Sequence, residues 1–157
     1  MMVFGQTSEE VDQIEFFKEL QIWNKKADKM SFSFWMPQSY WRITLKDNPS
    51  ISEEIITWIE TMFENYLVLC AADIIVSASP SSTNELFTYK DESTLRSELK
   101  FIDFAGDEHF PVSNDKVPSD IGTVLASLTP IFIQIFGEMG EGMHLYLFDN
   151  TDSNNQL

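Results

Sequence analysis

Near the start of the chain, hydrophobic residues recur every three or four positions, which is the spacing of one helix face. Thr7 and Glu10 lie three positions apart and form a capping box before this stretch. Acidic residues follow, and lysines gather over residues 25–29, where a helix dipole favours cations. The pattern predicts a helix over residues 8–28. Its apolar stripe consists of Val11, Ile14, Phe17, Leu20 and Trp23.

The next two segments alternate apolar and polar side chains with a period of two, as β-strands do. They cover residues 31–36 and 40–46, and both are rich in aromatic or β-branched residues. The link at residues 37–39 is short enough for an antiparallel hairpin. We expect the second strand to direct Arg42 and Lys46 toward water on one face.

A second amphipathic helix is predicted from residue 51 to about Asp73. Ser50 and Glu53 form its capping box, and no glycine or proline interrupts it. Periodicity does not decide whether residues 74–76 extend this helix or begin a strand, and we favour a helix that ends near Asp73. Its apolar face comprises Ile51, Ile55, Ile59, Met62, Tyr66 and Leu69.

The middle of the chain is less regular. Residues 77–84 have the composition of a loop, and residues 85–90 have that of a strand. Residues 98–104 fit both a helical and a strand spacing, and we favour a strand. Residues 106–118 form a second predicted loop, which carries several acidic side chains.

Two interpretations fit the last third of the chain. Ser119 begins a short helix that Pro130 interrupts, and residues 131–136 are then β-branched and aromatic. A glycine-rich turn leads to residues 143–148, so we favour a hairpin of two strands. The alternative makes Pro130 the first residue of a helix that ends at Gly137.

The order of these elements favours the α+β class. We expect a single domain over residues 1–148, in which a mostly antiparallel β-sheet of about five to six strands packs with one face against two to three helices. Residues 149–157 are predicted to be a polar C-terminal tail. The chain has 157 residues, of which 43% are hydrophobic and 13% aromatic. This composition supports a packed core and excludes disordered and disulfide-scaffold classes.

Charge is the strongest chemical signal in the sequence. The chain carries 25 acidic residues and 10 Lys or Arg, a formal net charge of −15. Residues 1–50 contribute seven acids and six bases, residues 51–100 nine and three, and residues 101–157 nine and one. The negative field therefore comes almost entirely from the last two thirds. Such a field repels nucleic acids and anionic membranes and attracts basic protein surfaces.

Few residues have the chemistry or spacing of a catalytic or metal site. The lone cysteine, Cys70, lies in an apolar run, so we expect it to be buried and inert. The sequence has no paired-cysteine spacing, no helical histidine pair and no Gly-x-Ser-x-Gly turn. We therefore expect no metal, no cofactor and no catalytic residue. If the chain acts on a small ligand, Asp103, His109 and His144 are the first residues to test.

Two features bear on where the protein resides. The first ten residues lack the basic and apolar regions of a secretory signal. The apolar runs near residues 66–78 and 124–136 are shorter than the ~20 residues that span a bilayer. We expect a cytoplasmic protein with no membrane partner.

The charge and the missing catalytic motifs favour a non-enzymatic, acidic protein-binding module. We expect an inhibitor or immunity-type protein that neutralises a basic partner, such as a toxin or a nucleic-acid-binding protein, by electrostatic steering and aromatic anchors. The alternatives are a small acidic chaperone for a secreted protein and a small-ligand-binding protein or enzyme. A monomer and a homodimer both remain open. The expected partner-binding residues are Glu60, Glu64, Asp107, Glu108, Glu138 and Glu141, with Trp35 and Tyr40 as anchors.

Overall fold

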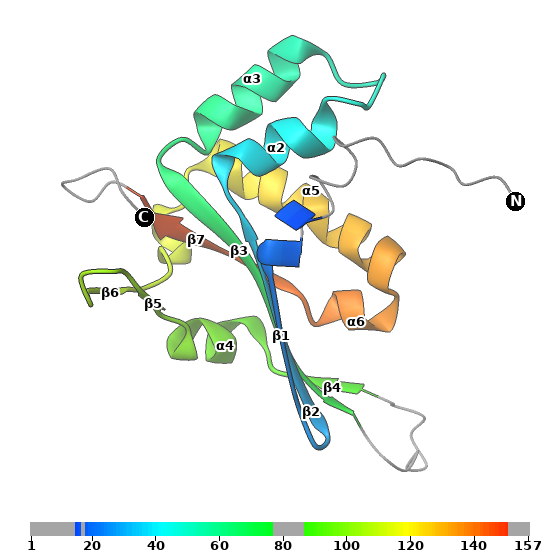
Figure 1. The fold of residues 1–157 in the computed structure, drawn as a ribbon, viewed down its shortest axis with the longest axis vertical. Coiled ribbons are helices and arrows are strands. Elements are labelled where there is room, and N and C mark those ends of the chain that lie inside the picture. Colours follow the sequence, from blue (N-terminus) through cyan, green and yellow to red (C-terminus); the bar gives the residue numbers. More distant parts are fainter. Residues whose placement is uncertain (1–14, 17, 77–86, 151–157) are drawn as a thin grey trace, which may run out of the picture.

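The computed structural model describes residues 15, 16, 18–76 and 87–150 (Figure 1). Its centre is a five-stranded antiparallel sheet, in which β1 pairs with β2, β2 with β3, and β3 with both β4 and β7. The predicted α+β class with a mostly antiparallel sheet is confirmed. The strands are β1 (Gln21–Lys26), β2 (Lys29–Met36), β3 (Tyr66–Val76), β4 (Phe87–Tyr89) and β7 (His144–Asp149).

Helices lie on both faces of the sheet, rather than on the single face expected (Figure 1). One face packs against α2 (Gln38–Leu45), α3 (Glu53–Met62) and α5 (Ser119–Phe136). The other packs against α4 (Glu92–Glu98), beside a separate hairpin of β5 (Phe101–Ile102) and β6 (Glu108–His109). A 3-10 turn, η1 (Asn114–Lys116), precedes α5, and the short helix α6 (Glu138–Glu141) follows it.

The central strand β3 is buried on both faces, which explains the largest error in the sequence prediction. Its side chains alternate between the two cores, with Cys70 in the core under α2, α3 and α5 and Ala71 in the core on the α4 side. A strand buried on both sides reads as a continuous apolar run and not as an alternating one. The helix predicted over residues 51–73 therefore ends at Met62, and β3 begins at Tyr66.

The helix predicted over residues 8–28 is wrong in its last third. The described residues up to Glu19 are helical, but β1 follows and pairs with β2. Trp23 lies opposite Phe32, and their ring centroids are 4.4 Å apart. Ladder pairing and this ring contact override the helical spacing. Ala27 closes the turn at a φ of 53°.

The second predicted strand, residues 40–46, is also wrong, because this segment forms α2. Pro37 precedes the helix in an extended conformation. The Trp41 ring is buried and stacks on Phe63 at 4.8 Å, which ties α2 to the end of α3. Trp41 and Leu45 are four positions apart, so the same apolar residues that suggested alternation also suit a helix face. The predicted strand at residues 31–36 is confirmed, but its hairpin partner is β1.

Residues 131–136 belong to α5 and not to the predicted hairpin. The helix passes through Pro130, which is exposed, and ends at Gly137 with a φ of 62°, a conformation that glycine adopts easily. Phe132 packs against the core, and the helix continues through this run although Ile131, Ile133 and Phe136 are exposed. Residues 143–148 do form most of a strand, β7, but it pairs with β3. The alternative interpretation was right that a helix ends at Gly137.

Helix α4 was not predicted. The Asp91 side chain caps it by accepting hydrogen bonds from the Thr94 amide at 2.9 Å and the Thr94 hydroxyl at 2.8 Å. Leu95 is the buried residue of this short helix and packs against the second face of the sheet.

The remaining predictions are met in part. Strands β4 and β5 lie within residues 85–90 and 98–104, where strands were expected. At the end of the chain, Asp149 completes β7 instead of beginning a tail. The predicted loop at residues 77–84 and the tail from residue 151 onward lie outside the described residues.

Candidate functional site

The acidic residues expected near α3 differ in their surroundings. Glu60 forms an ion pair with Arg42, with the Arg42 Nη2 to Glu60 Oε2 distance at 2.6 Å, and its side chain is 19% exposed. Glu53 contacts the same guanidinium group. Glu64 is exposed and has no ion pair within the described part of the chain. Arg42 thus offsets Glu60, and Glu64 contributes more to the external field.

The other predicted acids form two pairs that lie on different elements. Glu138 and Glu141 are exposed on α6. Asp107 and Glu108 are exposed near the turn between β5 and β6, where Glu108 forms an ion pair with Lys100. The structure therefore brings the predicted acids together in pairs and does not gather all of them on one surface.

The two predicted aromatic anchors are parts of the cores and are not exposed anchors. Trp35 packs against Phe101 and Phe148, with ring centroids 5.5 and 5.7 Å away, on the α4 side of the sheet. Tyr40 packs against Phe34 at 5.3 Å on the opposite side, and burial raises the pKa of its hydroxyl. One partner cannot bury both rings, because the sheet separates them.

Exposed apolar side chains occur instead on the β5–β6 hairpin, defined here as residues 101–110. Ile102 is 55% exposed, Phe104 107% and Phe110 61%. These three residues were missed in the sequence prediction. The available signal was three phenylalanines within ten residues that also hold three acids and a glycine.

The β5–β6 hairpin is held together by one carboxylate. Asp103 Oδ1 accepts hydrogen bonds from the Ala105 and Asp107 amides, both at 2.9 Å, and Asp103 Oδ2 lies 2.9 Å from His109 Nε2. The backbone closes the same turn, since the Gly106 amide donates to the Asp103 carbonyl at 3.0 Å. The contacts with His109 and with these amides hold the pKa of Asp103 below its usual range. Phe104 therefore projects from a preorganised turn, and Phe110 follows β6 at the other end of the hairpin.

The residues named for a possible enzyme are only partly brought together. Asp103 and His109 form the pair described above, whereas His144 lies on β7 with its Nε2 3.3 Å from the Lys90 carbonyl oxygen. The Asp103 carboxylate is occupied by the hairpin amides and by His109. These contacts of Asp103 with His109 and with the Ala105 and Asp107 amides hold the turn, and we call them the clasp.

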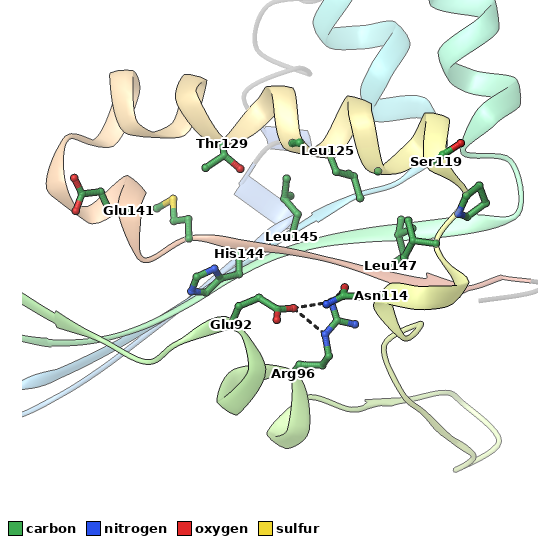
Figure 2. A pocket seen from close by; sticks show the side chains of 15 residues that line it. Glu92, Arg96, Asn114, Ser119, Leu125, Thr129, Glu141, His144, Leu145 and Leu147 are labelled. Carbon is green, nitrogen blue, oxygen red and sulfur yellow. Dashed lines mark hydrogen bonds and ion pairs between the residues drawn. The ribbon is translucent and has the colours of Figure 1, made fainter.

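A second feature is a cleft of about 630 Å³ beside β7, between α5 and α4 (Figure 2). Leu125, Ala126 and Gly122 line it from α5, and Leu145 lines it from the strand. Glu141 lies at its α6 end. The cleft therefore combines an apolar wall with an acidic end.

The α4 side of the cleft is a network around Arg96 (Figure 2). Its guanidinium group forms an ion pair with Glu92 at 2.6 Å and donates to the Asn114 side chain at 2.8 Å and to the Val112 carbonyl at 2.5 Å. It also lies over the Tyr146 ring, 5.1 Å from the centroid. Burial raises the pKa of Tyr146, whose hydroxyl donates to the Glu92 carbonyl at 3.0 Å. Each of the three guanidinium nitrogens of Arg96 thus already contacts a group of the protein.

Other candidate chemistry is sparse in the part of the chain that the structure describes. Cys70 is buried in β3, and burial raises its pKa to about 12, so the thiolate nucleophile is suppressed. No group of three metal-ligating side chains occurs among the described residues. None of the described helices has the length and hydrophobicity that crossing a bilayer demands.

Comparisons of this chain with protein-family models, with curated proteins and with solved structures gave no match.

Proposed function

We propose that this protein is a non-enzymatic binding module that docks onto a basic protein partner through the β5–β6 hairpin and neutralises it. The observation that carries the proposal is the presence of two exposed phenylalanines, Phe104 and Phe110, and two exposed acids, Asp107 and Glu108, on one short hairpin whose turn the Asp103 carboxylate holds. Exposed apolar groups of this kind, set among polar residues, are typical of interaction sites.

The two halves of this surface would act at different stages of binding. A net charge of −15 attracts a basic partner over a distance and speeds encounter. Burial of the phenylalanines then slows dissociation, because aromatic residues at the centre of an interface carry much of its energy. Asp103 lowers the entropic cost by fixing the turn before binding.

An inhibitor or immunity-type role in the cytoplasm fits these properties best. Such a protein needs affinity and fast association but no catalytic group, and a toxin or a nucleic-acid-binding protein supplies the required basic surface. The phenylalanines replace Trp35 and Tyr40 as the proposed anchors.

The test is to capture the partner from native cell extract with the wild-type chain and then measure binding to the purified partner. The double variant Phe104→Ser with Phe110→Ser removes the anchors, and Ile131→Ser removes a 45% exposed apolar side chain on α5 as a matched control. We expect a basic partner whose binding weakens with salt, is lost in the double variant and is retained in the control. An acidic partner, or equal binding by both variants, would contradict the proposal.

A dimeric chaperone is the second candidate, and one observation favours it. Trp23 of β1 is 49% exposed and contacts Phe32, which in turn contacts Phe136 of α5, itself 38% exposed. The exposed rings of Trp23 and Phe136, each in contact with the buried Phe32, mark a second apolar area near the β1 edge of the sheet. Light scattering of the purified chain separates the two candidates, because the chaperone requires a homodimer and the binding module does not.

A further inference from the structure

Strand β7 lies at an edge of the sheet, and its outer side borders the cleft in Figure 2. Its inner side pairs with β3 from Tyr66 opposite Asp149 to Ala71 opposite His144. On the outer side, the Leu147 carbonyl accepts a hydrogen bond from the Val112 amide at 2.7 Å. The backbone groups of Leu147 therefore point away from β3.

The same orientation holds two residues earlier in the strand, because backbone direction alternates along a strand with a period of two. The amide and carbonyl of Leu145 thus point outward, into the cleft that this residue lines. Among residues 18–76 and 87–150, no backbone group pairs with them across this edge. An unpaired edge of this kind is a template for another strand.

The walls of the cleft leave room for such a strand. On the α5 side, Gly122 and Ala126 are small, and a methyl group added at Gly122 would meet only Val117, at 3.8 Å. On the opposite side, α4 contributes Glu92, and Glu141 lies at the α6 end (Figure 2). A volume of about 630 Å³ is within the range of sites that enclose a ligand.

We propose that an extended segment of the basic partner adds to β7 as a strand and fills this cleft. The proposal rests on the function proposed above, since it takes the partner from there. Alternate side chains of an added strand point to opposite sides. Those that face α5 meet Leu125 and are apolar. Glu92 is already paired with Arg96, so the carboxylate that takes a Lys or Arg of the segment is Glu141 at the α6 end, which has no ion pair among the described residues.

Charge complementarity selects this occupant over others. An acidic segment would meet Glu141 without a free cation, because Arg96 is already bound to Glu92, Asn114 and Val112. A second copy of this chain would bring two bodies of net charge −15 together at the same edge. An extended segment with apolar residues toward α5 and a Lys or Arg toward Glu141 satisfies the Leu145 backbone groups, the apolar wall and the free carboxylate at once.

The probe for the test is a phage-displayed library of random dodecapeptides, selected against the full-length wild-type chain. Selected peptides are then synthesised and their affinities measured for the wild type and for Ala126→Trp, which fills the cleft from an exposed position. Ser127→Trp is the matched control, because Ser127 is the next residue on α5, is also exposed and does not line the cleft. Amide exchange of Leu145 is followed in parallel.

We expect peptides that carry apolar residues at alternate positions together with a Lys or Arg, a loss of affinity of about tenfold or more in Ala126→Trp, and wild-type affinity in Ser127→Trp. We also expect slower exchange of the Leu145 amide when the peptide is bound. Failure to select any peptide, equal binding by Ala126→Trp, or unchanged exchange at Leu145 would overturn the inference. So would a wild-type dimer that Ala126→Trp dissociates, since a second copy would then fill the cleft.

Failure here is distinguishable from failure of the proposed function. Phe104→Ser with Phe110→Ser leaves the cleft intact, so peptide binding should persist in that variant while capture of the partner is lost. If Ala126→Trp binds the purified partner as the wild type does, only the inference about the cleft is wrong. If the hairpin variant retains full affinity for the partner, the proposed function is wrong even where peptides bind in the cleft.

Discussion

The molecule carries two exposed hairpins of opposite charge, and their comparison shows what the overall charge conceals. The β1–β2 hairpin carries Lys25, Lys26 and Lys29 near its turn, and none of these is in an ion pair within the described residues. Within residues 101–110, the β5–β6 hairpin carries Asp103, Asp107 and Glu108 but no lysine or arginine, and Lys100 just before it pairs with Glu108. A net charge of −15 is therefore not uniform over the surface, and the two hairpins would attract different partners.

The hairpins also differ in how they are held. The β1–β2 hairpin belongs to the central sheet, where β2 pairs with β3 along the whole length of β2. Lysines along the edge strand β1 are also a common protection against edge-to-edge aggregation. The β5–β6 hairpin has only two paired positions and depends on the Asp103 carboxylate. Its geometry can therefore be changed by one substitution that leaves the sheet untouched.

The largest difference between the two hairpins is expected in partner affinity, when one apolar side chain is removed from each hairpin in separate variants. Phe104→Ser should weaken binding of the purified partner about thirtyfold or more, because an aromatic anchor contributes ~2 kcal/mol or more. Ile22→Ser, at a residue that is 58% exposed on β1, should leave the affinity within about twofold of the wild type. Titration calorimetry with both variants measures this difference. Equal losses would show that the partner does not distinguish the hairpins.

Charge reversal should have a smaller effect, and mainly on the rate of association. Asp107→Lys should slow association about tenfold at low salt, and Lys25→Glu should leave it unchanged or slightly faster. The difference should shrink as salt rises, since exposed charges are screened. Stopped-flow measurement at two salt concentrations tests this prediction. A slower association for Lys25→Glu would show that the β1–β2 hairpin takes part in the encounter, and would contradict the proposal.

Loosening the clasp should cost several-fold in affinity with little change in overall stability. Asp103→Asn weakens the contact with His109 and the hydrogen bonds to the Ala105 and Asp107 amides. The hairpin amides should then exchange faster, while the midpoint of denaturant unfolding stays close to that of the wild type. Asp107→Asn is the control, because it removes a nearby charge and keeps the clasp. A large fall in the unfolding midpoint would give Asp103 a global structural role instead.

The smallest effect is the pH dependence of the same clasp. Folding lowers the pKa of Asp103, so its carboxylate stabilises the hairpin above the pKa of the unfolded chain. That contribution is lost as pH falls through the still lower pKa of the folded state. The amide resonance of Ala105, which donates to the same carboxylate, should therefore shift in strongly acidic solution in the wild type and not in Asp103→Asn. A transition near neutral pH in both proteins would assign the effect to another group.

The two hairpins also show how much of the fold could be predicted from the sequence. The α+β class and strand β2 were predictable because alternation over residues 31–36 is strong. Residues 21–26 were assigned to a helix, because Trp23 fits both spacings and only its pairing with β2 decides. The prediction of the central strand β3 failed for a related reason, since burial on both faces removes the polar positions that mark a strand.

The candidate site was predictable only in its acidic part. Asp107 and Glu108 could be named from loop composition, but ion pairing of Glu60 with Arg42 depends on two helices meeting. Trp35 is buried by Phe101, a contact across distant parts of the chain that no local pattern contains. The exposure of Phe104 arises because nothing described packs over the turn, which is equally invisible in sequence.

The most direct test is an amide-exchange footprint of the wild-type chain with and without its purified partner. The account predicts protection over residues 101–110 and no change over the β1–β2 hairpin at residues 21–36. Protection over residues 21–36 with none over residues 101–110 would contradict it.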